Sequence, residues 1–191
     1  GGEIILSSSQ KGELVTNGMS NYARNQAFSN AGIVVSVSPE DFPPGVLGGI
    51  QFQKRIEQRA FALGDKNYFA PAQRLSDFIH NRTPKSLGPG SFRPGMVPVP
   101  MKHVLPENIV RALSKGFQAF ERRIPGFIEN GLLVAPETRT SSPVRILREK
   151  TTAESINVRG LYPIGEGAGY AGGIVSSAAD GLKLAYRVKA I

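Results

Sequence analysis

The sequence predicts a mixed fold of helices and strands, in the α+β or mixed α/β class. Apolar residues recur every three or four positions in the segments 49–63 and 106–124, which is the period of an amphipathic helix. The β-branched run Ile33–Val37 has instead the composition of a strand. With 191 residues, of which 40% are hydrophobic and 20% charged, the chain can form one sizeable core and lacks the composition of a disordered or membrane-spanning segment.

The first strands should form a hairpin. Apolar runs at Glu3–Leu6 and Glu13–Val15 flank a polar stretch, whose turn is expected near Lys11-Gly12. Asn17-Gly18 then predicts a break in the chain. The next strand, Ile33–Val37, should end at the prolines that follow it.

Three helices are expected in the middle of the chain. One should span Gly49–Leu63 and stop at Gly64. A shorter one is expected to begin at Pro71, since proline suits the first helical position. The third should begin near Pro106 and be bent or interrupted around Gly116.

The remaining elements are shorter. The segment 81–100 is rich in proline and glycine, so it should be an extended loop. Strands are expected at Leu132–Ala135 and at Val144–Leu147. A last strand at Leu161–Ile164 leads into a glycine-rich turn, and a closing helix begins near Ile174.

Composition excludes several kinds of chemistry. The chain has no cysteine, so it has no thiolate nucleophile and no Cys-ligated metal. His80 and His103 stand far apart without further ligands at metal spacing, and no metal site is predicted. The formal net charge of +8 comes from scattered basic residues, which makes nucleic acid an unfavoured partner. Because neither a signal peptide nor a membrane-spanning run is visible, a cytoplasmic location without membrane association is expected.

The segment 165–173 carries the clearest functional signal, because five of its nine residues are glycines: Gly165, Gly167, Gly169, Gly172 and Gly173. Glycines let a backbone approach a flat or phosphorylated ligand, and free N–H groups at a helix start can donate to an anion or a carbonyl. A tight packing corner is the alternative. The match to G-x-G-x-x-G is not expected to be an ADP-binding fingerprint, because the chain ends inside the next helix.

This segment resembles the C-terminal segment of the two-dinucleotide-binding-domain flavoproteins, which consists of an apolar strand, Gly-Glu or Gly-Asp, a glycine-rich turn and a helix. Other motifs extend the resemblance over nearly the whole chain: Asn17-Gly-Met-Ser20 with Arg24, Ser38-Pro-Glu-Asp-Phe42, Ala70-Pro-Ala-Gln-Arg74 and Glu137-Thr-Arg-Thr-Ser-Ser-Pro-Val-Arg145. Together they are similar to a bacterial family of FAD-dependent, or NAD(FAD)-utilising, dehydrogenases of uncharacterised function. In that family an FAD-binding region precedes these motifs, so the chain is expected to be a C-terminal fragment of a longer protein.

The resemblance implies a cofactor site for FAD, formed by Gly165, Glu166, Gly167, Gly169, Gly172, Gly173 and Ile174. The carboxylate of Glu166 would hydrogen-bond the ribitol chain. The closing helix would direct its positive end at the N1 and C2 carbonyl side of the flavin ring. A surface carboxylate stabilised by the helix dipole is the alternative for Glu166.

Further polar residues are candidates for the substrate side. Arg139 and Arg145 are predicted to face the flavin or an anionic substrate, with a polar loop that holds one structural ion pair as the alternative. Asn17, Ser20 and Arg24 follow a turn and either line the substrate side or cap a helix. No catalytic residue is assigned.

The expected organisation is a substrate-side, inserted domain at residues 1–140, followed by the C-terminal segment of an FAD-binding domain at residues 141–191. The parent enzyme would be a flavin-dependent oxidoreductase with FAD as cofactor, a small-molecule substrate and NAD(P)H as a candidate electron donor. The fragment alone should be inactive, and its uncovered apolar faces predict self-association. The alternative is a non-catalytic module that uses its basic surface to bind nucleic acid or an acidic partner.

Overall fold

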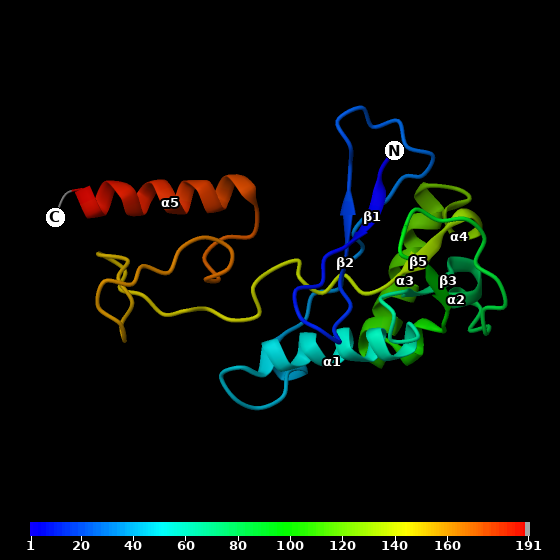
Figure 1. Cartoon of the computed structure of the whole chain (residues 1–191), viewed down its shortest axis with the longest axis horizontal. Coiled ribbons are helices and arrows are strands. Elements are labelled where there is room, and N and C mark those ends of the chain that lie inside the picture. Colours follow the sequence, from blue (N-terminus) through cyan, green and yellow to red (C-terminus); the bar gives the residue numbers. More distant parts are fainter. Residues whose placement is uncertain (190–191) are drawn as a thin grey trace. The chain divides into compact units, whose positions relative to one another are not determined.

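The structure is a computed structural model that describes residues 1–189. The chain divides into two compact units, which are treated separately (Figure 1): unit 1 is Gly1–Ser38 with Lys54–Thr138, and unit 2 is Pro39–Gln53 with Arg139–Ile191. Helices and small sheets occur together, which confirms the predicted mixed α and β class. The predicted domain division at residue 140 stays a prediction, and the last two residues of the segment 141–191 lie outside the described residues.

The first sheet in unit 1 is the antiparallel pair β1 (Glu3–Leu6) and β2 (Thr16–Met19). The turn near Lys11-Gly12 is confirmed, but the second strand lies three residues later than predicted. The expected break at Asn17-Gly18 falls inside β2, paired with β1. The reason is that Leu14 and Val15 are fully buried, and the amide of Leu14 donates to the carbonyl of Glu57, so core packing outweighs the local strand pattern.

The second sheet of unit 1 has the strand order β4-β3-β5. The central strand β3 (Ala70–Arg74) runs parallel to β4 (Met96–Pro98) and antiparallel to β5 (Leu132–Val134). β5 confirms the predicted strand at that position. The other two strands were missed, since β3 is buried along its length and so has no alternating pattern, and β4 lies in the presumed loop.

Proline explains the error at β3. Pro71 was expected to begin a helix, but it lies within the strand opposite Val97, and its carbonyl accepts a hydrogen bond from the amide of Ala135. The short helix α2 (Leu75–Ile79) begins four residues later. A strand can contain proline at a position whose backbone N–H would not donate a hydrogen bond to a neighbouring strand.

Two long helices agree with the prediction. They are α1 (Gly48–Leu63), which begins in unit 2 and ends in unit 1, and α3 (Glu107–Arg123) in unit 1. α3 is followed by the four-residue helix α4 (Phe127–Asn130), which packs against both α2 and α3. The predicted interruption at Gly116 is wrong, because α3 is continuous there. Short 3-10 turns occur at Pro39–Asp41 and Met101–His103.

The core of unit 1 lies where α2, α3 and α4 meet the second sheet. Phe117 of α3 is fully buried and meets Phe78 of α2 edge to face, with ring centroids 5.7 Å apart. Ile33 and Val35 pack against this core, but the predicted strand Ile33–Val37 is wrong. The side chains of residues 33–36 alternate between half-buried and exposed, yet no strand pairs with this segment among the described residues, and a strand needs a partner.

Unit 2 contains one long helix besides the start of α1, namely α5 (Ile174–Lys189). This helix confirms the prediction, whereas the strands expected at Val144–Leu147 and Leu161–Ile164 are both wrong. The backbone there forms isolated contacts instead, such as the hydrogen bond from the amide of Ile146 to the carbonyl of Ala168. None of the helices in the described part of the chain is long and apolar enough to cross a membrane.

The continuity of α3 predicts that Gly116→Ala stabilises the protein. A Cβ atom built on Gly116 meets nothing within 4 Å, so alanine adds helix propensity without a clash. We expect the free energy of unfolding to rise by about 1 kcal/mol, measured by urea denaturation followed by circular dichroism. Gly131→Ala is the control that should destabilise, because its Cβ would lie 2.7 Å from Leu75. A loss of stability in Gly116→Ala would mean that α3 does break there.

Candidate functional site

The glycine corner, defined as residues 165–173, leads from an irregular segment into α5. Two of its glycines are required by the fold of the chain itself. Gly165 has φ +71° and Gly169 has φ +82°, a region that favours glycine. A Cβ on Gly169 would also lie 2.4 Å from the carbonyl oxygen of Val144. These two positions therefore turn the backbone and allow a close approach within unit 2.

The other three glycines of the corner have no such explanation. Gly167, Gly172 and Gly173 do not have positive φ. A Cβ on Gly167 or Gly172 would meet no atom within 4 Å, and one on Gly173 would meet only Ser176 Oγ at 3.9 Å. Side chains would fit at all three positions as far as the described residues are concerned. Their backbone instead forms an open surface without side chains.

The backbone amides of the corner also form two groups, one with hydrogen-bond partners within the chain and one without. The N–H of Gly165 donates to Asp180 Oδ2 at 2.9 Å, and the N–H of Gly169 donates to the carbonyl of Glu166 at 2.8 Å. Within residues 1–189, the amides of Gly172 and Gly173 have no hydrogen-bond partner. They join the free N–H groups of the first turn of α5, where the helix dipole is positive. The open surface can therefore donate hydrogen bonds to a negative or carbonyl group.

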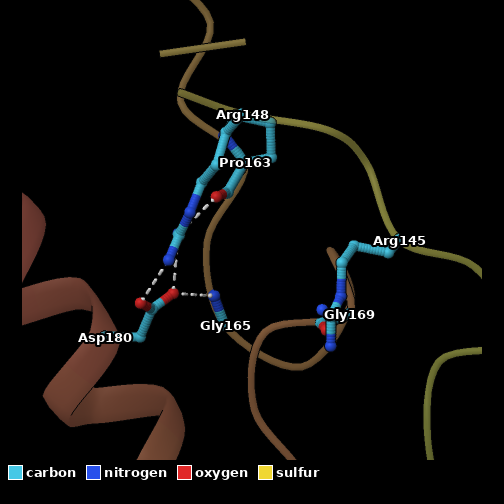
Figure 2. Close-up of polar contacts among 6 residues, drawn as sticks. All are labelled: Arg145, Arg148, Pro163, Gly165, Gly169 and Asp180. Carbon is cyan, nitrogen blue, oxygen red and sulfur yellow. Dashed lines mark hydrogen bonds and ion pairs between the residues drawn. The ribbon is translucent and has the colours of Figure 1, made fainter. Parts of the chain in front are cut away.

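An ion pair holds the corner in place. Arg148 and Asp180 form a two-pronged contact, with Nη2 donating to Oδ1 at 2.7 Å and Nη1 to Oδ2 at 2.9 Å (Figure 2). Nη1 also donates to the carbonyl of Pro163 at 2.7 Å, and the amide of Gly165 completes the contacts of Asp180. We call this group the Arg148–Asp180 clasp. It ties the residues before the corner to the middle of α5.

The clasp is shielded from water and stays ionised. The side chains of Arg148 and Asp180 are 13% and 14% exposed. The hydrogen bond from Arg148 holds the pKa of Asp180 at about 2, helped by the amide of Gly165, and the same hydrogen bond raises the pKa of Arg148. Both charges are therefore present throughout the physiological pH range.

A second set of contacts supports the far side of the corner. Arg145 Nε donates to the carbonyl of Gly169 at 3.0 Å, and Ser142 Oγ, which donates to the carbonyl of Val144 at 2.8 Å, lies 3.2 Å from the carbonyl oxygen of Gly167. The ring of Tyr170 lies 3.7 Å from the guanidinium of Arg148 and 5.2 Å from that of Arg145. The corner thus packs along the segment 142–148.

The structure brings some of the predicted cofactor residues together and gives Arg145 a structural contact. Glu166 lies in the corner, half-buried, and its carboxylate has no hydrogen-bond or ion-pair partner among residues 1–189. Ile174 is 92% exposed at the start of α5. Arg145 is bonded to the corner itself, which leaves its predicted contact with flavin or substrate as a prediction.

The remaining candidates lie elsewhere in the chain. Asn17 in β2 and Ser20 just after it are exposed residues of unit 1. Arg24, also in unit 1, has φ +49°, and its carbonyl accepts a hydrogen bond from the N-terminal amine of Gly1. Arg139 is exposed in unit 2. No group of three His, Asp or Glu side chains in the described part of the chain is placed to hold a metal ion.

The sequence analysis missed the clasp. Asp180 is the single acidic residue of α5, and Arg148 stands 32 residues before it. One signal was available, since aspartate is unfavourable inside a helix that is otherwise apolar and basic, unless a partner compensates it. The sequence did not identify that partner.

Comparison with known proteins assigns the family. Residues 1–140 match the family described as FAD-dependent protein, C-terminal domain-like. The chain belongs to this family. An uncharacterised protein of Clostridium beijerinckii is 45% identical over 192 residues, which cover 98% of this chain and 36% of the relative. The chain therefore spans about a third of the length of this relative, and the similarity continues beyond residues 1–140 of this chain.

The depressed pKa of Asp180 predicts a pH dependence of the corner. In the folded protein this pKa is about 2, below its ordinary 3.8, so the clasp stabilises above pH 4 and this stability is lost as the pH falls toward 2. Asp180→Asn should weaken protection of the Gly165 amide against hydrogen exchange by on the order of 1–2 kcal/mol at pH 6, and very little at pH 2.

Asp77→Asn is the matched control, because Asp77 pairs with Arg82 in unit 1. It should leave the exchange rate of the Gly165 amide unchanged at every pH. If Asp180→Asn had the same effect at pH 2 as at pH 6, the ionised clasp could not be the source of the protection.

Proposed function

We propose that this chain is the flavin-contacting C-terminal part of an FAD-dependent oxidoreductase of the two-dinucleotide-binding-domain superfamily, and that the glycine corner lies against the flavin. The observation that carries the proposal is the open surface at Gly167, Gly172 and Gly173, which the rest of the chain does not explain. Membership of a family described as FAD-dependent supports the choice of ligand. A flat aromatic ring system is the kind of group that a surface without side chains admits closely.

The residues of the corner fit the polar edge of a flavin. The free amides of Gly172 and Gly173, with the first turn of the 16-residue helix α5, would donate to the N1 and C2 carbonyl side of the ring. The half-buried carboxylate of Glu166 would accept hydrogen bonds from the ribitol hydroxyls. Flavin, when bound, supplies hydride and electron transfer. The helix dipole would stabilise the negative charge of the reduced form.

Further exposed polar residues are the candidates for contacts with substrate. Asn17, Ser20 and Arg24 are those of unit 1, and Arg139 of unit 2 would bind an anionic substrate or the flavin. The reaction is a hydride transfer through the flavin, with NAD(P)H as the candidate electron donor and a small-molecule substrate as the acceptor. The resemblance in sequence and the membership of the FAD-dependent family support these assignments.

The proposal predicts that Gly172→Ala weakens FAD binding without disturbing the fold. A methyl group fits at Gly172 within this chain, so thermal stability should stay unchanged, while the methyl would separate the backbone from the flavin. In the natural polypeptide that contains this chain, we expect FAD affinity to fall at least about tenfold, measured by quenching of flavin fluorescence. Gly167→Ala should act in the same direction.

Gly116→Ala is the control, since it introduces the same methyl group at another open glycine, in α3. It should leave FAD affinity unchanged. Wild-type affinity in both Gly172→Ala and Gly167→Ala would contradict the placement of flavin against the corner.

A further inference from the structure

A cavity of about 150 Å³ lies beside the clasp in unit 2. Its lining residues come from α5 and from the segment 148–153: Arg148, Ala153, Asp180, Lys183, Leu184 and Arg187. A cavity of this volume is large enough for a benzene-sized group. Three of the six side chains are cationic and one is anionic, so the cavity is positively charged.

The single carboxylate does not neutralise this charge. Asp180 is engaged by both Nη atoms of Arg148 and by the amide of Gly165. Lys183 and Arg187 form no ion pair with any residue among 1–189. They are four residues apart on α5, where two like charges destabilise a helix. An anion between them would relieve that repulsion and balance the cavity.

The wall of the cavity is also unusual. Ala153 is 1% exposed and has φ +62°, a conformation in which glycine would be less strained. Ala153 lines the cavity, as does the half-buried Leu184. Backbone strain of this kind is concentrated at functional sites. The cavity therefore combines a strained, buried residue in its lining with a net positive charge.

We propose that this cavity binds a phosphoryl group, with the Lys183 ammonium and the Arg187 guanidinium as its charge partners and the Arg148–Asp180 clasp as its wall. A phosphoryl group carries about −1.5 to −2 charges at neutral pH, which matches the excess of cations in the cavity lining, Arg148, Lys183 and Arg187 against Asp180, better than the single charge of a carboxylate does. Lysine binds phosphate as a point charge and arginine as a two-pronged donor. The site is separate from the glycine corner and does not rest on the flavin proposal.

The test is titration of the 191-residue chain with inorganic phosphate at pH 7.5 and constant ionic strength, followed by NMR chemical shifts. We expect saturable shifts of residues 148–153 and 180–187. Lys183→Ala with Arg187→Ala should weaken binding at least about tenfold. Arg55→Ala with Arg59→Ala is the matched control, because these two exposed arginines have the same spacing on α1 and line no part of this cavity. The control variant should bind phosphate as the wild type does.

A second variant separates the cavity from its charge. Leu184→Phe keeps every charge and fills part of the cavity, so it should also weaken phosphate binding. The unfolding midpoint of this variant is compared with that of the wild type to show that the fold is kept. Shifts that do not saturate, or an equal loss in the control variant, would overturn the proposal.

Two further ligands identify the source of the phosphoryl group. Tighter binding of ADP than of inorganic phosphate would support a nucleotide as the ligand, and the reverse order would support free phosphate. Acetate binding as tightly as phosphate would overturn the phosphoryl assignment.

Discussion

The ion pair between Arg148 and Asp180 is the contact on which the organisation of unit 2 depends. It joins the segment before the glycine corner, the first amide of the corner and the middle of α5 through four hydrogen bonds. Because both side chains are largely shielded from water, loss of either one would leave the other as an uncompensated charge. The pair therefore connects segments that strand pairing would connect in a sheet, since the two strands expected before the corner, at residues 144–147 and 161–164, are not formed.

The five glycines of the corner serve two different purposes. Gly165 and Gly169 are required by the backbone conformation of this chain, because both have positive φ. At Gly169 a side chain would also clash with the carbonyl oxygen of Val144. Gly167, Gly172 and Gly173 satisfy no such need, and they expose backbone amides to the outside. This distinction is more informative than the number of glycines. It separates the positions where the fold of the chain requires glycine from those where a bound ligand would account for it.

The long helices and the corner were predictable from sequence, whereas the pairing of distant residues was not. α1, α3 and α5 follow from helical spacing, which is a local property. Residues 33–37, 144–147 and 161–164 have the composition of strands, but a strand forms only beside a partner that lies elsewhere in the chain. The Arg148–Asp180 clasp could not be predicted for the same reason, because nothing near Asp180 in the sequence indicates that Arg148 is its partner.

The exposure of α5 explains why the clasp has to be strong. Ile174, Val175, Leu182 and Tyr186 all present large apolar side chains to solvent, so burial of an apolar face contributes little to this helix within the described chain. A helix of 16 residues is marginal in water by itself. The buried contacts of Asp180, near the middle of the helix, are therefore the main tether that fixes α5 to unit 2. Together with the hydrogen bonds of Ser176 and Ser177 to the carbonyl of Gly173, the contacts of Asp180 fix the positions of the N-terminal amides of α5 and of its cations Lys183 and Arg187.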